Sequence, residues 1–531
     1  MTTIEAIADW AVELSAADIP SHVLGRCRDQ RRSVLGAVAA SHRDPAARRV
    51  VGAVERWAAP GPAPLLGAGG TVDVEPAVYA GTALSVALDY DDYLCFGHTG
   101  HTAVLVPALM AAETGSDGID QLVAQTISNE VEGRLGGATL LGPMNGQLWA
   151  FIQAAGAAVA AGRLMGLDRP RLAHALAISL AHPVRATVAG FMAPDAKLLV
   201  AAEPAAAGVR AARLADAGVT GPLDALDEER GALAALSFAP LRGILSGFGD
   251  GWATQTLSVK AYPGCAYIDT TIDALLELLD ENAMAPDDVT EVTVEAGMLT
   301  CGMDALSSPY AALEPPTPVT INFNIGWNTA IVLLAGRLTE AEVAPGWLEA
   351  NREPLSALRT KVRLKHAPDL TAASAAAFAG MIPVAALRSE LGVRRLASAA
   401  RQVRAEHPGA GMGVGDLLGI ARSARSSGRD TLAAIRRTKW WDPQSLDDFA
   451  VTFPARVTLT GRDGRSRTAR VDVPRGGAGN TTEGPAEVAR AKLDRSGAAV
   501  WGTEGTAAIQ HAIDVDDAKL HSLIHVEGRE G

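Results

Sequence analysis

Cysteine is scarce in this chain, with four residues in a sequence of 531. Cys27, Cys95, Cys265 and Cys301 are scattered along the sequence, and none of them forms a pair at the spacing of metal ligands. This pattern argues against a disulfide framework and is typical of a protein from a reducing compartment. We therefore expect a cytoplasmic protein.

An excess of basic residues is also absent. The 47 lysines and arginines are outnumbered by 60 aspartates and glutamates, which gives a formal net charge of -13 at pH 7. A surface of this charge repels phosphate backbones, so we expect no nucleic-acid partner. It still allows an anionic small-molecule substrate, because a few inward-facing lysines or arginines can reverse the local field.

Long apolar runs are missing as well. The most apolar windows, such as residues 148–162, are too short and too rich in glycine for a membrane span. The first residues carry acids and no basic stretch before an apolar core, so we expect no signal peptide. The chain is 48% hydrophobic and 20% charged, which predicts large buried cores. Its length predicts roughly two to four domains.

Helical periodicity dominates the first half of the sequence. Alanine-rich segments at 149–165, 169–181 and 200–216 predict helices whose small side chains allow close packing. We predict a large all-helical domain over residues 1–256. The tail, residues 481–531, is helical again and is expected to return to this domain.

The residue pattern changes near residue 257 from purely helical periodicity to a mixture of strand and helix signals. Alternating β-branched residues at 289–297 predict a strand, and residues 319–340 predict a helix. Two further alternating runs flank the turn GRDGR at 461–465 and predict a hairpin. We therefore predict an α+β domain over 257–480 with a helical insertion at 370–447. The predicted fold class is mainly α.

The chemically richest segment precedes an apolar helix. Asp89, Asp91, Asp92, His98 and His101 lie within a few turns of backbone. Carboxylates beside imidazoles can transfer protons near neutral pH. The alternative interpretation is an acidic loop with solvent-exposed histidines at the start of a helix.

Two lysines lie in otherwise apolar surroundings. Lys197 follows GFMAPDA, and Lys260 precedes a proline turn and an apolar helix. Such a lysine either extends its ammonium group to water or has a role that depends on its charge. The sequence pattern alone leaves both interpretations open.

Several blocks of the sequence resemble the MmgE/PrpD family, which includes 2-methylcitrate dehydratase, cis-aconitate decarboxylase and iminodisuccinate epimerase. The blocks include LDYDDY, GHTGHTAVLVPALMAAE, ISNEVEGRLG and VKAYPGCAYIDTTIDALLEL, and they occur in the family's order between residues 75 and 280. The resemblance implies a helical first domain, a smaller α+β lid and a C-terminus that returns to the helical domain. It also implies a homodimer, no metal or organic cofactor, and an active site between the domains.

The resemblance assigns site residues by position. Asp89 matches the family's aspartate, and Lys197 and Lys260 match its two lysines. The first histidine corresponds to His98 or His101, because spacing from the aspartate favours His98 and spacing to the following proline favours His101.

Three positions depart from the family pattern. Gln147 and Cys265 stand where the family has histidines, and Trp327 stands where it has a tyrosine. Glutamine cannot act as a general base, and tryptophan can only donate a hydrogen bond. All three also fit ordinary structural roles, as a polar residue at a helix start, a small buried residue and a packing aromatic. These changes predict a substrate that is less polar than citrate-like acids.

The function predicted from these residues is a cofactor-independent lyase of the dehydratase or decarboxylase type. It would act on a carboxylate-bearing small molecule by proton abstraction and enolate stabilisation. One of the two histidines, oriented by Asp89, would move the proton, while Lys197 and Lys260 would hold a carboxylate or enolate oxygen. Tyr93 and Arg134 are further candidates for substrate binding, although Arg134 also fits a structural ion pair.

Three alternatives stay open. An isomerase or epimerase would use the same carbon-acid chemistry and then return the proton. A metal-dependent hydrolase would use His98 and His101 with Asp89 or Asp92 as ligands, although the HxxH spacing lacks the pattern of HExxH enzymes. A non-catalytic relative would have kept the fold and lost the chemistry.

Overall fold

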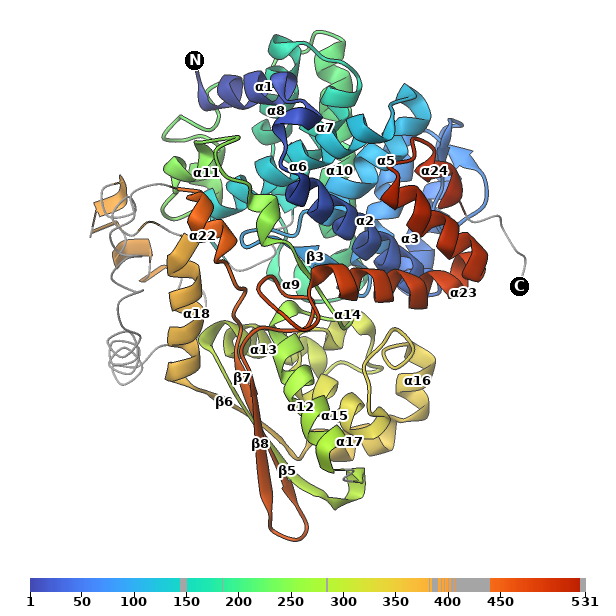
Figure 1. The fold of residues 1–531 in the computed structure, drawn as a ribbon, viewed down its shortest axis with the longest axis vertical. Helices are drawn as coiled ribbons and strands as arrows, with labels where there is room; N and C mark the ends of the chain where they lie inside the picture. Colours follow the sequence, from blue (N-terminus) through green and yellow to red (C-terminus); the bar gives the residue numbers. More distant parts are fainter. Residues whose placement is uncertain are drawn as a thin grey trace.

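A computed structural model describes residues 1–143, 150–183, 185–282, 285–381 and 440–525, together with short stretches between 383 and 405. Helices form most of this part of the chain, and the strands are few (Figure 1). The predicted fold class, mainly α, is confirmed. Within the described ranges, no helix combines the length and apolar character needed to cross a membrane.

The first half of the chain folds into a body of packed helices (Figure 1). Three of them, α7, α8 and α10, coincide with the predicted alanine-rich helices to within one residue. The helices of this body are α1 (Thr3–Glu13), α2 (Ser21–Ser41), α3 (Pro45–Trp57), α4 (Val74–Val86), α5 (Gly100–Thr114), α6 (Gly118–Ala138), α7 (Ala150–Leu164), α8 (Arg169–Ala181), α9 (Val188–Met192), α10 (Leu199–Asp216) and α11 (Ala232–Leu236).

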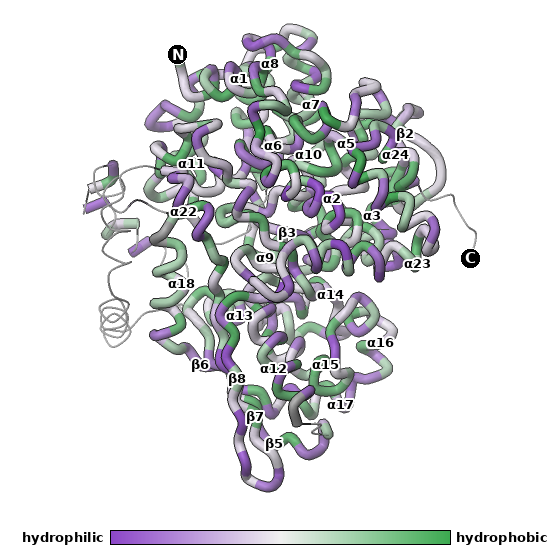
Figure 2. The backbone as a smooth tube through the Cα atoms, in the orientation of Figure 1, coloured by the Kyte–Doolittle hydropathy of each residue, from purple (hydrophilic) through white to green (hydrophobic). Residues whose placement is uncertain are grey.

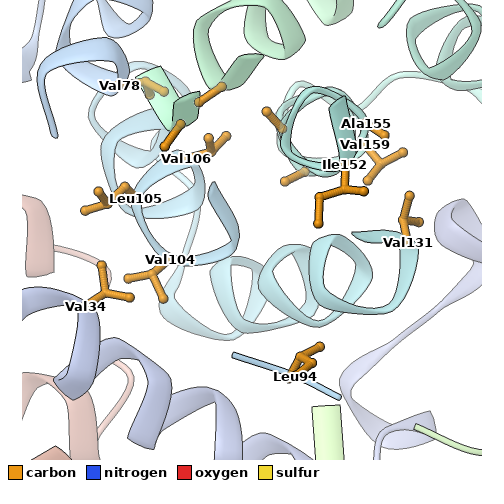
Figure 3. Packing of buried hydrophobic residues seen from close by; sticks show 14 of the residues in the cluster. Val34, Val78, Leu94, Val104, Leu105, Val106, Val131, Ile152, Ala155 and Val159 are labelled. Atoms are coloured by element: carbon orange, nitrogen blue, oxygen red, sulfur yellow. The ribbon is translucent and has the colours of Figure 1, made fainter. Parts of the chain in front are cut away.

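Small residues let these helices approach closely. A Cβ atom added at Gly208 on α10 would lie 2.4 Å from Ala154 O on α7, so only glycine fits there. Aliphatic side chains of α5, α6 and α7, among them Val106, Val131 and Ile152, fill the interior beside them (Figure 3). Helix α7 is mostly hydrophobic in Figure 2, which agrees with its burial.

The C-terminal segment lies against the helical body. Helix α23 (Pro485–Asp514) packs along α2, and α24 (Leu520–Leu523) follows it (Figure 1). A Cβ atom at Gly36 on α2 would meet the Lys492 side chain at 2.8 Å, which shows how close the two helices are. The predicted domain boundaries at 256 and 480 stay a proposal.

The second unit contains a four-stranded sheet in the order β6-β5-β7-β8. Strand β5 runs parallel to β6 and antiparallel to β7, and β7 and β8 form the predicted hairpin around GRDGR. The predicted strand at 289–297 is confirmed as β5. The tip of the hairpin is hydrophilic in Figure 2, as expected for an exposed turn. The strands are β5 (Val289–Ala296), β6 (Val362–His366), β7 (Ala455–Gly461) and β8 (Ser466–Val471).

Helices cover the apolar face of this sheet. Alternate residues of β7 are buried, and α12 and α15 pack on the sheet. Helix α15 lies within the predicted helical stretch at 319–340. The helices of this unit are α12 (Asp269–Asn282), α13 (Met298–Ala311), α14 (Pro318–Ile321), α15 (Ile325–Ala335), α16 (Pro345–Ala350) and α17 (Arg352–Arg359).

The predicted insertion at 370–447 is described only at its ends. Helices α18 (Pro368–Met381) and α22 (Pro443–Asp447) lie there, and most of the positions between them are outside the described residues. Short 3-10 turns cover Ala16–Asp18, Asp195–Leu198, Arg242–Leu245, Ala253–Thr256, Ala266–Ile268 and Pro286–Asp288.

Two small strand pairs complete the fold. Strand β1 (Ala63–Pro64) pairs with β2 (Thr71–Val72). Strand β3 (Asp92–Tyr93) pairs with β4 (Ser258–Val259) and thereby ties the acidic segment to the chain just before Lys260. The pairing of β3 with β4 thus brings the acidic residues and Lys260, the residues of the candidate site, close together.

Candidate active site

The predicted acidic run lies between α4 and α5, in residues 87–99, here called the acidic loop. Asp89 has a left-handed backbone conformation with φ of 52°. Its N–H donates to Val86 O at 2.9 Å and closes a turn at the end of α4. Aspartate tolerates this conformation better than most residues with a side chain.

Two lysines from distant parts of the chain converge on Asp89. Lys197 Nζ donates to Asp89 Oδ2 at 2.8 Å, and Lys260 Nζ donates to Oδ1 at 2.9 Å. Asn322 Nδ2 adds a hydrogen bond to Oδ2 at 3.0 Å. All of these groups are buried. The structure therefore brings together three predicted site residues and adds Asn322, which sequence reasoning missed.

Asp91, and not Asp89, contacts the imidazoles. Its Oδ2 lies 2.6 Å from His98 Nδ1 and 3.2 Å from His101 Nε2, while its Oδ1 accepts from Lys260 Nζ at 2.5 Å. The prediction that Asp89 orients a histidine is wrong, because the Asp89 carboxylate faces the two lysines and Asn322. The acidic run itself was the only sequence signal for Asp91.

The two histidines differ in exposure. The His98 side chain is 20% exposed, whereas His101 is fully buried. His101 Nδ1 lies 2.7 Å from Ser85 Oγ, so both nitrogens of this ring face fixed groups of the protein. Gln153 Nε2 donates to the backbone oxygen of His98 at 2.9 Å and holds the loop at that point. Of the two imidazoles, only that of His98 is partly exposed.

Opposite charges set the ionisation of the two aspartates. Burial by itself would raise the pKa of Asp91, but Lys260, His98 and the hydrogen bonds of both histidines hold that pKa well below its usual value. In the same way, Lys197 and Lys260 outweigh burial and lower the pKa of Asp89. Both carboxylates are therefore ionised at neutral pH.

Burial and the aspartate partners act in opposite directions on the pKa values of the basic groups. Burial lowers the pKa of Lys260, but Asp89 and Asp91 raise it more, so this ammonium group stays charged. Burial lowers the pKa of Lys197 and of His98, and their aspartate partners offset only part of the effect. His98 is therefore a neutral imidazole at neutral pH, which can accept a proton.

Lys492, which was not predicted as a site residue, binds the backbone of the acidic loop. Its Nζ donates to Tyr90 O at 2.9 Å and to Ser33 Oγ at 3.0 Å. Burial lowers the pKa of Lys492 to about 7, and burial raises the pKa of Asp92 to about 7. The position of Lys492 beside Leu493 on an apolar helical stripe was the available signal.

Aromatic rings extend outward from His98. The ring centroid of Tyr93 lies 5.8 Å from that of His98 and 6.4 Å from that of Phe453. Phe453 in turn lies 4.7 Å from Tyr267 and 5.8 Å from Phe378 on α18. The predicted residue Tyr93 is thus next to the partly exposed imidazole of His98, at one end of a row of packed aromatic rings.

Arg134 and Trp327 lie away from the cluster. Arg134 donates to Gly251 O at 2.7 Å, pairs with Glu130, and stacks over Phe248 at 4.2 Å, so its guanidinium is used in the protein interior. Trp327 Nε1 donates to Ala311 O at 2.9 Å in the core of the α+β unit. The structure therefore assigns packing roles to both, contrary to the prediction that they bind substrate.

Cys265 and Gln147 are the two remaining predicted site residues, and only Cys265 lies among the described residues. Cys265 is buried close to the cluster, and its N–H donates to Asn322 O at 2.9 Å. Burial raises the pKa of its thiol to about 12, so Cys265 is a neutral group. Gln147 lies outside the described residues. Across the described ranges, no three His, Cys, Asp or Glu side chains gather as a metal site requires.

Comparison with known proteins matches the chain to two domains of one protein family. Residues 5–241 match the MmgE/PrpD N-terminal domain, and residues 262–408 match the MmgE/PrpD C-terminal domain. A cis-aconitate decarboxylase of Aspergillus terreus is 25% identical over 295 residues, which cover 51% of this chain and 59% of that protein. A second cis-aconitate decarboxylase, from A. terreus strain NIH 2624 / FGSC A1156, matches with the same identity and coverage.

The chain therefore aligns with only 59% of the length of these curated relatives. The two domain matches, in contrast, follow one another in order and together span most of the sequence. The acidic loop and Lys197 lie in the first match, and Cys265 and Asn322 lie in the second. On this evidence, the chain belongs to the MmgE/PrpD family.

Proposed function

We propose that this protein is a cofactor-independent lyase, of the dehydratase or decarboxylase type, that acts on a carboxylate-bearing small molecule. The observation that carries the proposal is a neutral, partly exposed imidazole, His98, beside a buried cluster of two ammonium groups and two carboxylates. The likeness to cis-aconitate decarboxylase, a lyase by name, supports the same reaction class.

His98 is the proposed base. Asp91 Oδ2 lies 2.6 Å from Nδ1 and accepts a hydrogen bond from Nδ1–H in the proposed tautomer, so Nε2 is the basic nitrogen that takes a proton from carbon next to a carboxylate. The charge of Asp91 then stabilises the imidazolium that forms. The alternative base, His101, has both nitrogens beside protein groups and no exposed surface.

Lys197 is the proposed cation for the substrate carboxylate or the developing enolate. Lys260 donates three hydrogen bonds, to Asp89 O, Asp89 Oδ1 and Asp91 Oδ1, and so uses its full donor capacity inside the protein. We therefore assign Lys260 to holding the two aspartates in place. A preorganised ammonium group such as Lys197 stabilises developing negative charge without reorganisation.

The substrate is proposed to be less polar than citrate-like acids. The ring wall of Tyr93, Phe453, Tyr267 and Phe378 offers apolar and aromatic contact beside His98. Cys265 is a neutral thiol at a position where the family has a basic histidine. Both features favour a carboxylate that carries an apolar group over a tricarboxylate.

We also propose that the protein acts in the cytoplasm as a homodimer. The scattered cysteines and the family resemblance support these two points. Sedimentation of the purified protein should give about twice the chain mass of 54.9 kDa. A species of single-chain mass at micromolar concentration would contradict the dimer.

A carboxylate screen tests the reaction. The purified protein, dialysed against a chelator, is incubated in D2O with cis-aconitate and with unsaturated or hydroxylated carboxylates bearing alkyl or aryl groups. Mass spectrometry should detect loss of water or carbon dioxide, fastest for the less polar compounds, with turnover unchanged by the chelator.

Other outcomes of the screen identify the alternatives. Deuterium uptake at carbon without loss of mass would indicate an isomerase or epimerase. Activity lost on chelation and restored by a metal would contradict cofactor independence and favour the metal-dependent alternative. No turnover and no deuterium uptake with any compound would indicate a non-catalytic member of the family.

A further inference from the structure

Lys492 carries a buried ammonium group that forms no ion pair with a carboxylate of the described residues. It is 1% exposed, and its Nζ donates to Ser33 Oγ at 3.0 Å, Tyr90 O at 2.9 Å and Asp91 O at 3.4 Å, which are all neutral acceptors. Buried charges are normally paired, because an isolated ammonium group is costly to take out of water. The lowered pKa of Lys492, about 7, agrees with a cation whose charge no contacting anion balances.

Lys492 also lines a pocket of about 480 Å³, between α12, α23 and the residues that follow α15. Tyr90 of the acidic loop forms part of the wall, and Leu276 adds apolar surface. The candidate active-site residues His98 and Lys197 are not among the described residues that line it. The pocket is therefore distinct from the candidate active site.

Arginines give this pocket an excess of positive charge. Its lining includes four cationic side chains, those of Arg337, Arg475, Lys492 and Arg495, and two carboxylates, those of Glu483 and Glu487. Each arginine is also paired with one glutamate: Arg337 with Glu342, Arg475 with Glu483 and Arg495 with Glu340. A guanidinium group has five N–H donors, so one glutamate leaves donors for a second anion. The charge and the donors of the lining thus suit an anionic ligand.

Tyr90 connects the pocket to the acidic loop. Its Oη donates to Ala261 O at 3.0 Å and accepts from Arg495. Its ring centroid lies 4.1 Å from Lys492 Nζ, which also holds the backbone oxygens of Tyr90 and Asp91. A ligand in contact with Lys492 or Arg495 therefore acts on the loop that carries the buried aspartates.

We propose that this pocket binds a small organic oxyanion, a carboxylate or a phosphate with a short apolar group, whose charge balances that of Lys492. Arg475 and Arg495 donate to the oxyanion, as guanidinium groups commonly do to carboxylates and phosphates. Lys492 supplies the buried positive charge, and Leu276 contacts the apolar group. This binding site goes beyond the proposed lyase function and does not depend on it.

Titration calorimetry with two matched probes, phenyl phosphate and phenylacetate, tests the site. At pH 7 and constant ionic strength, the wild type should bind at least one of them. The Kd should rise by about tenfold or more in Arg495→Gln and in Lys492→Met, since each variant loses a charged partner of the anion. Tighter binding of phenyl phosphate would identify the ligand as a phosphate ester, and tighter binding of phenylacetate would identify it as a carboxylic acid.

Arg490→Gln is the matched control for Arg495→Gln, because Arg490 lies on the same helix, is 50% exposed and does not line the pocket. Lys197→Met is the second control, since it changes only the candidate active site. Both controls should bind the probe as the wild type does. No binding of either probe, equal Kd values for Arg495→Gln and Arg490→Gln, or binding lost in Lys197→Met would overturn the proposal.

The Arg495 side chain is 42% exposed, so the result for Arg495→Gln does not depend on the folding of Lys492→Met. Calorimetry measures no turnover, which separates this proposal from the lyase function. A failed carboxylate screen with normal probe binding would reject the lyase and keep the anion site. A working lyase that binds neither probe would do the reverse.

Discussion

Asp91 Oδ2 lies within reach of two imidazoles, at 2.6 Å from His98 Nδ1 and 3.2 Å from His101 Nε2. A single carboxylate therefore orients one ring that is partly exposed and one that is fully buried. The same carboxylate accepts from Lys260 through its other oxygen, so the charge balance of the site depends on this residue.

His98→Gln should lower kcat for the carboxylate found in the screen by about 10²- to 10⁴-fold, because glutamine cannot accept the proton. His101→Gln should cost much less activity and instead lower the free energy of unfolding by about 1–3 kcal/mol, since it disturbs the contacts to Ser85 and Asp91. Steady-state kinetics and thermal unfolding separate the two effects. His22→Gln, at an exposed position, is the control, and the assignment fails if His101→Gln has the larger kinetic defect.

Lys492 should give the stability a defined pH dependence. Its pKa falls from the usual 10.5 to about 7 on folding, so between these values the unfolded chain binds more protons than the folded protein. The stability of the wild type relative to Lys492→Met should therefore rise as pH increases from about 7 towards 10.5. Denaturant unfolding across this range, with exposed Lys519→Met as the control, measures the difference. Parallel curves for the wild type and Lys492→Met would rule out the lowered pKa.

At the scale of elements, the site depends on how closely helices approach behind it. The first turn of α5 carries Gly100, where an added Cβ atom would lie 2.2 Å from Asp92 Oδ2. On α7, an added Cβ atom at Gly156 would lie 1.9 Å from Glu132 Oε1. Thr102 and Ser128 hydroxyls donate to that same oxygen, so the glutamate cannot easily move away. Glycine at these two positions makes room for buried carboxyl groups next to the acidic loop.

Gly156→Ala should therefore lower the free energy of unfolding by about 1–3 kcal/mol, as expected when a packed interior receives an extra methyl group. Gly52→Ala on α3 has no heavy atom within 4 Å of the added Cβ, and it should raise stability by about 0.5–1 kcal/mol. Both substitutions replace a glycine inside a helix, so their opposite signs isolate the packing effect. Chemical denaturation measures both, and equal signs would contradict the close approach.

At the scale of the whole molecule, helices from near both ends of the chain pack together beside the site. Helix α23 packs along α2, and Lys492 from α23 donates to the carbonyl of Tyr90 in the acidic loop. Strand β3 of the same loop pairs with β4, and Asn322 from the α+β unit donates to Asp89. Three separate parts of the chain therefore hold a single loop in place, so the site forms only in the complete fold.

Removal of α23 and everything after it, by ending the chain at Gly484, should abolish cooperative unfolding, because the buried face of α2 would be exposed to water. Leu493→Ala, in the same interface, should lose only about 2–5 kcal/mol and keep a cooperative transition. Thermal melts followed by circular dichroism compare the two. A truncated protein that melts cooperatively at the wild-type temperature would show that the C-terminal helix is dispensable.

Much of the fold could be predicted because its causes are local. The helices α7, α8 and α10 follow alanine-rich periodicity, and the β7–β8 hairpin follows alternation around GRDGR. Hydrogen bonds of a helix or a two-strand hairpin join residues that are near one another in sequence, so a short window contains the information. The close link between Asp89, Lys197 and Lys260 came instead from resemblance to a family, since no local pattern connects residues so far apart.

The sequence by itself therefore determined the mainly α class, the principal helices, the hairpin and the presence of acids, histidines and lysines suited to proton transfer. Only the tertiary structure decided that Asp91 contacts both histidines while Asp89 binds the two lysines, that Arg134 and Trp327 pack elsewhere, and that Lys492 holds the acidic loop. The physical reason is that charge pairing and pKa depend on distance in space and on burial, and both exist only after the chain has folded.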